Sequence, residues 1–324
     1  MDKISYLENL FIPPESTVAG YAFCDIPIPI TFNGSKICII GIPIDITTTF
    51  GKTASFGPEA IRIASAKQIE TLVFEENVEV YEKALIYDIG DLNFVKPKEG
   101  RISDIHEINK FWIDFDRKLS SVLRIIIDSN KIPVILGGEH TITYSIYKEL
   151  SESHPLLIHF DAHRDMKPIY QGMSMCHTTP FYHLIKEGYL RGNDLVQIGI
   201  RQGDREENKF ALDNGVTTFD AWDCNSSLWK ILQWLKSNTL NRDIYISFDI
   251  DVYDISYLPC TGTPEPFGLN PFQILDLINS ISNTARLVGL DFVETGLKNN
   301  DYREGALATQ TLLRILSRPY MSNL

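Results

Sequence analysis

Short apolar runs rich in β-branched residues alternate along the chain with longer stretches in which apolar residues recur at helical spacing. The runs that predict strands cover residues 36–44, 84–92, 132–140, 156–165, 194–202, 216–221, 243–252 and 286–294. The stretches with helical periodicity cover residues 57–72, 103–129, 141–152, 205–215, 226–237, 270–282 and 304–317. Strands that alternate with helices in this way predict an α/β fold with a mostly parallel central sheet and helices on both of its faces.

The organisation of the chain favours a single large domain. No internal repeat or low-complexity linker interrupts the alternation of strands and helices. The first 35 residues differ from the rest because they are rich in proline, as in "IPPES" and "IPIPITF". We therefore expect an N-terminal arm over residues 1–35, lying over the domain or over a neighbouring subunit, and a catalytic domain over residues 36–324.

Composition narrows the class of protein. The chain has 324 residues, of which 44% are hydrophobic, and a net charge of −12, which disfavours a general nucleic-acid surface. The longest apolar runs are too short to span a bilayer, and the N-terminus has no apolar signal-peptide core. The five cysteines, Cys24, Cys38, Cys176, Cys224 and Cys260, form no Cys-x-x-Cys pair. We expect a cytoplasmic protein with no nucleic-acid or membrane partner.

Polar residues gather where the predicted strands end. The strand ends in question are "ILGGEH" with His140, "HFDAHRD" with Asp161, His163 and Asp165, "SFDID" with Asp249 and Asp251, and "GLDFVE" with Asp291 and Glu294. Alternate residues of a strand share one face, so the two aspartates of "SFDID" point the same way. Ligands of open α/β sheets bind outside the carboxyl ends of the strands. These ends therefore predict a functional site.

The donor set at these ends is typical of a metal site. If the strands are neighbours, four carboxylates and two imidazoles converge, and buried charges of this kind must be paired, protonated or metal-bound. Two divalent cations would neutralise the four carboxylates, and oxygen and imidazole ligands without thiolate favour manganese, with iron, cobalt, nickel and zinc left open. Each motif alone is also compatible with a solvated loop or a turn. Together they predict a binuclear centre.

The same motifs resemble those of the ureohydrolase family, which includes arginase and agmatinase. The resemblance rests on "GIPID", "FGPEAIR", "GGEH", "DAHRD", "SFDID" and "TGTPEPFGL", and "GGEHTIT", "CHTTPFYH" and "GIRQGDREENKFALDNG" are closest to the agmatinase-like branch. It implies an arginase-like three-layer α/β/α fold and two Mn²⁺ ions per chain. It further implies hydrolysis of a C–N bond in a small guanidino compound such as agmatine, giving urea and an amine, in a homo-oligomer, a trimer or hexamer.

The resemblance also implies roles for individual residues. The first ion would be held by His140, Asp161, Asp165 and Asp249, and the second by Asp161, His163, Asp249 and Asp251. His177, in "CHTTPF", matches the family's proton shuttle, and Glu294, in "GLDFVE", matches the carboxylate that receives the guanidinium group. We also expect that the neighbouring His159 packs in the core or holds one of the metal-ligating side chains in place.

Several positions depart from the family pattern and leave the substrate open. They are Ser55, Ile255, Cys260 and residues 295–305. A carboxylate tail on the substrate could pair with Arg201 or Lys167, whereas an amine tail could face Asp204, Glu206 or Glu207. The alternatives within the family are a formimidoylglutamase and a hydrolase of guanidine or of a guanidino acid. The alternative that is not an enzyme is a non-catalytic relative of the family, which keeps the metals for stability and binds a partner.

Overall fold

A nine-stranded sheet forms the centre of the computed structural model, which describes residues 3–25, 30–97 and 105–319. Its strands are β1 (Phe11–Ile12), β2 (Ile37–Gly41), β5 (Ile86–Leu92), β6 (Ile132–Leu136), β7 (Leu156–Phe160), β8 (Leu195–Ile200), β9 (Thr217–Asp220), β10 (Asp243–Asp249) and β11 (Arg286–Val293). They lie in the order β1-β5-β2-β6-β11-β10-β7-β8-β9, and every neighbouring pair is parallel except β1 with β5. A separate hairpin joins β3 (Leu72–Val73) to β4 (Val78–Glu79).

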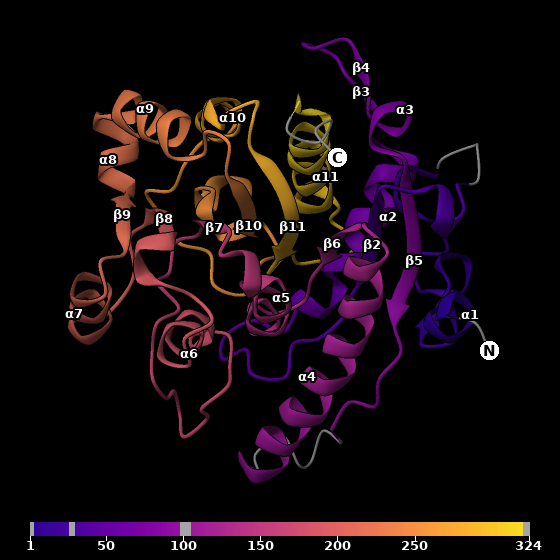
Figure 1. The fold of residues 1–324 in the computed structure, drawn as a ribbon, viewed down its shortest axis with the longest axis horizontal. Helices are drawn as coiled ribbons and strands as arrows, with labels where there is room; N and C mark the ends of the chain where they lie inside the picture. Colours follow the sequence, from indigo (N-terminus) through magenta and orange to yellow (C-terminus); the bar gives the residue numbers. More distant parts are fainter. Residues whose placement is uncertain (1–2, 26–29, 98–104, 320–324) are drawn as a thin grey trace.

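Helices cover both faces of the sheet (Figure 1). They are α1 (Lys3–Glu8), α2 (Gly57–Lys67), α3 (Val80–Ala84), α4 (Ile105–Asp128), α5 (Ile142–Leu150), α6 (Pro180–Lys186), α7 (Arg205–Asp213), α8 (Ala221–Ser226), α9 (Leu228–Asn238), α10 (Pro271–Ser280) and α11 (Arg303–Ser317). One hydrophobic core lies under α2, α9, α10 and α11, and a second lies under α1, α4, α5 and α6. The predicted three-layer α/β/α architecture is thereby confirmed. Among the helices that the structure describes, none is both long and apolar enough to cross a membrane.

Most of the predicted elements appear with shorter boundaries than the apolar pattern gives. The strand predicted from residue 84 begins at Ile86, because Leu85 has left-handed backbone geometry (φ 47°) at the end of α3. Helix α6 was not predicted, since its seven residues are too few to show a helical period. The helix predicted over 103–129 is α4, and its first two predicted residues lie outside the described part of the chain.

The described part of the N-terminal arm packs on the domain. Leu7 of α1 is fully buried, and β1 extends the edge of the sheet by pairing Phe11 with Leu92 of β5. Further along the arm, the backbone N–H of Phe23 donates to Asp88, a carboxylate that also pairs with the buried Arg62 guanidinium at 2.8 Å. Residues 26–29 of the arm lie outside the described residues. The division at residue 35, a contact of the arm with another subunit and the cytoplasmic location stay predictions.

The register of the central strands fixes where the polar ends lie. Strands β6, β11, β10 and β7 are consecutive in the sheet, and Phe248 of β10 is paired with both Phe160 of β7 and Phe292 of β11. The Phe248 ring centroid lies 5.1 Å from that of Phe160 and 4.6 Å from that of Phe292. We call these three side chains the phenylalanine row. Because side chains alternate, Asp161 and Asp249 follow the row on the opposite face, toward α5 and α6.

Candidate metal centre

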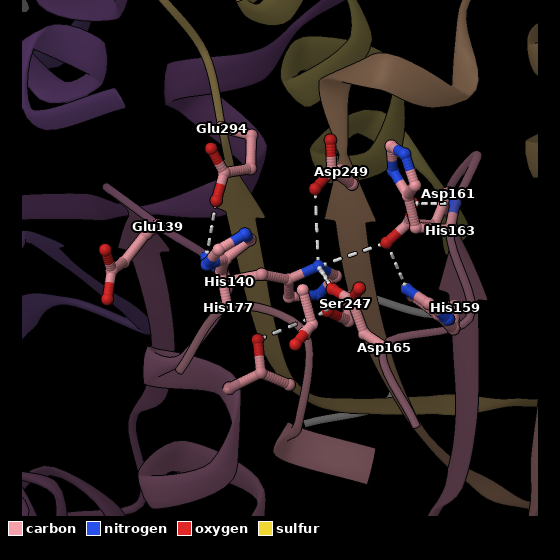
Figure 2. A network of polar contacts seen from close by, with 12 residues as sticks. Glu139, His140, His159, Asp161, His163, Asp165, His177, Ser247, Asp249 and Glu294 are labelled. Atoms are coloured by element: carbon pink, nitrogen blue, oxygen red, sulfur yellow. Dashed lines mark hydrogen bonds and ion pairs between the residues drawn. The ribbon is translucent and has the colours of Figure 1, made fainter. Parts of the chain in front are cut away.

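Three carboxylates surround one ring nitrogen of His140. His140 Nδ1 lies 3.1 Å from Asp161 Oδ2, 3.0 Å from Asp165 Oδ2 and 3.3 Å from Asp249 Oδ2 (Figure 2). The nitrogen is buried, and within the described residues it has no hydrogen-bond partner with acceptable geometry. A metal ion bound here would be coordinated by this buried, unpaired nitrogen and by the carboxylates around it.

A second group of ligand atoms lies beside the first and shares Asp161 with it. His163 Nδ1 is 2.9 Å from Asp251 Oδ2 and 3.5 Å from Asp161 Oδ1. Ligand atoms of Asp161, His163 and Asp251 all lie within 4.8 Å of one another, as do ligand atoms of His140, His159 and Asp161. The structure therefore brings together the six residues predicted as ligands.

Strand geometry explains only part of this convergence. Asp161 follows the last residue of β7 and Asp249 ends β10, as the alternation predicts, but Asp165 lies beyond the strand with left-handed geometry (φ 53°). Asp251 belongs to a 3-10 turn over Ile250–Val252, in which its N–H donates to Asp249 Oδ1 at 2.9 Å. A left-handed non-glycine residue costs about 1–3 kcal/mol, so the loop holds Asp165 in place at the expense of stability.

His140 reaches the cluster through a tight turn. Gly138 lies against the backbone of Ile44, and a Cβ at position 138 would come within 1.8 Å of the Ile44 carbonyl oxygen. The N–H of Glu139 donates to the same carbonyl at 2.8 Å, and the N–H of Glu294 donates to Gly138 O at 2.9 Å. The two glycines of "GGEH" therefore place this turn between two backbone segments, with His140 facing the carboxylates.

A buried polar row lies two residues before Asp161 and Asp249 along their strands. His159, Ser247 and Asp291 occupy paired positions of β7, β10 and β11. Ser247 Oγ lies 2.9 Å from His140 Nε2 and donates to Asp291 Oδ1 at 2.8 Å, while Asp291 also accepts hydrogen bonds from Thr143 and Tyr245. This network fixes the His140 ring so that Nδ1 faces the carboxylates, as partners behind a ligand commonly do.

His159 contacts the cluster from the same row. Its Nε2 is 2.7 Å from Asp161 Oδ2, and its Nδ1 is 3.1 Å from the side-chain amide of Gln197. Burial lowers the pKa of His159 to about 4, so the ring is neutral at pH 7. A neutral ring that donates from Nε2 to Asp161 and accepts from Gln197 at Nδ1 satisfies both contacts. His159 thus orients Asp161, as expected of a histidine that holds a ligand.

The charges of the cluster are not balanced by the protein itself. Burial, reinforced by Asp161, raises the pKa of Asp165 to about 7, and burial with Asp251 and Asp161 raises the pKa of Asp249 well above its usual value. Within the described residues, no lysine or arginine forms an ion pair with these carboxylates. A divalent cation would favour their ionised forms. The oxygen and imidazole donors therefore fit a metal ion.

A cavity of about 310 Å³ opens beside the cluster. Asp165, Asp249, Asp251 and His163 form its floor, and the predicted catalytic residues His177 and Glu294 lie in its wall together with Thr49, Tyr170 and Thr178. The outer wall includes the loop residues Lys167, Gln202, Asp204 and Glu265, and Glu207 in the first turn of α7. The structure thus places both predicted catalytic residues next to the candidate metal cluster.

His177 is held by two residues that the sequence did not single out. Thr47 Oγ1 accepts from the N–H of His177 at 3.1 Å and lies 3.3 Å from His177 Nδ1. The fully buried Glu139 carboxylate accepts from Thr47 N at 2.6 Å and from Thr47 Oγ1 at 2.8 Å. Burial lowers the pKa of His177 to about 4, so its ring is neutral at pH 7. The only sequence signal was that Glu139 precedes His140 in "GGEH".

Glu294 is aimed at the site by its backbone. It follows β11 with left-handed geometry (φ 58°), and its Oε1 accepts from the His140 N–H at 2.9 Å. Burial, reinforced by the nearby Glu139, raises the pKa of Glu294 well above its usual value. A cationic ligand that enters the cavity would form an ion pair with this buried carboxylate and so stabilise its charged form.

The charged residues expected to select the substrate tail are largely occupied. Lys167 pairs with Asp204 and, at 2.9 Å, with Glu207. Arg201 donates to backbone carbonyls, including Asp251 O at 2.7 Å, and Glu206 is exposed outside the cavity. The predicted roles of Arg201 and Glu206 in contacting the substrate are therefore wrong for this geometry.

The departures from the family pattern lie behind the cavity wall. Ser55 donates to Asp45 at 2.8 Å, and Ile255 is exposed. The buried Glu304 carboxylate accepts from Cys260 N at 2.6 Å and from Gly296 N at 2.8 Å, so it joins the two divergent loops. Ser55, Ile255 and Cys260 themselves do not line the cavity.

An oxygen-rich cluster beside a cavity, at the carboxyl ends of a parallel sheet, defines an α/β enzyme of the metal-dependent class. The model of the Arginase family matches residues 35–316, and the chain belongs to this family. The mitochondrial agmatinase of Gallus gallus is 32% identical over 83% of this chain and 76% of its own length. The mitochondrial guanidino acid hydrolase of Homo sapiens is 31% identical over 87% of this chain and 78% of its own length.

A solved structure supports the same assignment. Proclavaminate amidino hydrolase from Streptomyces clavuligerus superimposes with a TM-score of 0.79 and 27% identity, over 96% of this chain and 100% of the other. With the family membership, these relatives identify the protein as a hydrolase that acts on carbon–nitrogen bonds of amidines. The predicted family and the predicted enzyme class are confirmed.

Proposed function

We propose that the protein is a binuclear manganese hydrolase that cleaves a C–N bond of a small guanidino compound, agmatine being the first candidate, to give urea and an amine. The observation that carries the proposal is the convergence of ligand atoms around the unpaired His140 Nδ1, next to a cavity that Glu294 and His177 also line. Family membership and the agmatinase relatives support the choice of reaction.

The ligand residues divide into two overlapping sets in this proposal. His140, Asp161, Asp165 and Asp249 would hold one ion, and Asp161, His163, Asp249 and Asp251 would hold the other. Two ions with four carboxylates give a neutral cluster, which removes the cost of burying the charges. When bound, such ions would act as Lewis acids and would lower the pKa of water. A resonance-stabilised guanidinium is a poor electrophile, so its hydrolysis requires a nucleophile as strong as hydroxide.

The residues of the wall perform the remaining work. The Glu294 carboxylate pairs with N–H groups of the guanidinium and orients its central carbon toward the cluster. His177 carries a proton to the leaving amine nitrogen, for which a neutral ring held by Thr47 is suited. Water adds to the central carbon as the C–N bond to the tail breaks, so the products are urea and an amine.

Metal content tests the binuclear centre. Elemental analysis of protein prepared without chelator should find about two transition-metal ions per chain, manganese first among them. Protein that contains none after preparation in manganese-supplemented buffer would refute the proposed centre.

Product release tests the reaction. Metal-loaded protein should release urea from at least one member of a panel that contains agmatine, arginine, 4-guanidinobutyrate and guanidine. Release of formamide and glutamate from formimidoylglutamate would instead assign it to the formimidoylglutamase branch. Silence on all five compounds would favour a non-catalytic relative.

A further inference from the structure

One carboxylate of the outer cavity wall, Glu265, forms no ion pair with a lysine or arginine among the described residues. Glu265, in "TGTPEPFGL", lines the cavity with a side chain that is 24% exposed. Its Oε2 accepts from Gln202 Nε2 at 3.0 Å, and its Oε1 lies 3.8 Å from His163 Nε2. In the sequence, Glu265 is marked only as an acidic residue in a polar loop after the strand that carries Asp249 and Asp251.

The cations of the same wall are engaged elsewhere. Lys167 is neutralised by Asp204 and Glu207. Arg164 donates from NH1 to Gln197 at 2.8 Å and to Thr218 at 3.1 Å, on strands β8 and β9. A substrate tail that ends in a carboxylate would therefore meet no unengaged cation in the described wall, and it would face Glu265.

The backbone of Glu265 is tied to the metal-binding cluster. The Arg201 guanidinium donates to Glu265 O at 3.0 Å, to Pro266 O at 2.9 Å and to Asp251 O at 2.7 Å. Arg201 thus links the turn that carries Asp251 to the loop that carries Glu265. A charged group held at a fixed position relative to the cluster can select a substrate by the length and charge of its tail.

We propose that Glu265, held by Gln202, binds the cationic end of the substrate tail, and that the enzyme therefore acts on guanidino compounds that end in an ammonium group rather than a carboxylate. The assignment rests on the proposed function, in which the guanidinium itself lies at Glu294. The relatives alone do not decide the tail, because an agmatinase and a guanidino acid hydrolase are similar to this chain to nearly the same degree, at 32% and 31% identity.

The test is a comparison of two substrates of similar length, agmatine and 4-guanidinobutyrate, with wild-type protein and Glu265→Gln. Wild type should prefer agmatine at least about tenfold in kcat/KM. Glu265→Gln keeps an oxygen for Gln202 but loses the charge, so kcat/KM for agmatine should fall by about 10–100-fold, chiefly through KM. The value for 4-guanidinobutyrate should stay the same or rise. Glu206→Gln, an exposed position outside the cavity, is the matched control and should change neither.

Two outcomes would overturn the assignment of Glu265. Equal loss on both substrates through kcat would make Glu265 a positioning residue for His163. A wild-type preference for 4-guanidinobutyrate would show that the tail binds elsewhere. Both outcomes leave the proposed hydrolysis intact, whereas silence of metal-loaded wild type on every guanidino substrate would refute the hydrolysis and the tail site together.

Discussion

The floor of the cavity and its outer wall are built in different ways. At the floor, the positions of Asp249 and of the neighbouring Asp161 are set by the pairing of β7 with β10, and turns after these strands bring in Asp165 and Asp251. The outer wall consists of loops and the first turn of α7, and its charges are arranged by contacts such as Lys167 with Glu207 and Arg201 with the Asp251 carbonyl. The register of the sheet and the turns at its edge therefore determine the floor, whereas local hydrogen bonds determine the wall.

This difference separates chemistry from selectivity. The aspartates of the floor are buried, and each touches several other groups, so a change there should remove function altogether. Lys167, Asp204 and Glu265 of the outer wall are partly exposed, so a change there should alter which substrate is used. Substitutions in the two regions test this distinction.

The largest effect is expected at Asp161, which belongs to both ligand groups. Its Oδ2 is close to ring nitrogens of His140 and His159, and its Oδ1 accepts from the His163 N–H. Asp161→Asn replaces one of these acceptors with a donor and removes a charge, so we expect loss of both metal retention and turnover. Elemental analysis and urea release measure the two. Asp213→Asn, at an exposed ion pair with Lys209, should retain both. A metal-loaded, active Asp161→Asn protein would contradict the shared-ligand model.

His177→Ala should preserve the metals and lower kcat by about 10²–10⁴-fold, because proton transfer to the leaving amine would lose its carrier. Metal content and kcat, measured on the same preparation, separate this effect from that of Asp161→Asn. His154→Asn, an exposed position with left-handed geometry that asparagine tolerates, should behave as wild type. Unchanged kcat in His177→Ala would remove the shuttle assignment.

A smaller loss is expected at Thr47, which contacts His177 without lying against the substrate. Thr47→Val removes the hydroxyl between Glu139 and His177, so we expect kcat to fall about tenfold with little change in KM. Thr47→Ser restores the hydroxyl and should recover kcat to within about twofold. If the serine variant is as slow as the valine variant, the methyl group rather than the hydrogen bond is responsible.

The smallest effect concerns stability and pH. The pKa of His177 is lowered from 6.5 to about 4, so the unfolded chain takes up its proton first as the pH falls below 6.5. His177 therefore destabilises the fold progressively from pH 6.5 down to about pH 4, by about 1–2 kcal/mol between pH 7 and pH 5. Urea unfolding should show that His177→Asn loses less stability than wild type over this interval. Parallel losses in both proteins would show that the ring does not stay neutral on folding.

The sequence predicted the floor more completely than the wall. The alternation of apolar and polar residues located β6, β7, β10 and β11, and their polar ends located the ligand residues. Asp165 and Asp251 were found as well, although turns rather than strand alternation bring them in. Such turns depend on backbone torsions that no apolar pattern encodes.

The residues of the wall that contact a substrate could not be predicted from the sequence, because several charged side chains can pair with one another or with backbone carbonyls. Arg201 looked free to bind a substrate, but backbone carbonyls surround its guanidinium. Glu265 belongs to a motif that carried only the family resemblance, but the residue lines the cavity. Thr47 is 92 residues from Glu139 along the chain, and a contact of that separation leaves no local signal.

The phenylalanine row has a consequence for how the chain folds. Parallel pairing brings together distant segments and is slow, so β10 can meet its neighbours in wrong registers before the correct one forms. A shift of β10 by one residue would turn Asp249 toward the apolar core under α10 and α11, and would direct the Phe248 ring at the carboxylates. Contacts among the three rings, of which Phe248 and Phe292 are stacked, make that misfolded pairing costly. The phenylalanine row thus favours the register that places Asp249 at the candidate centre, before any metal can bind.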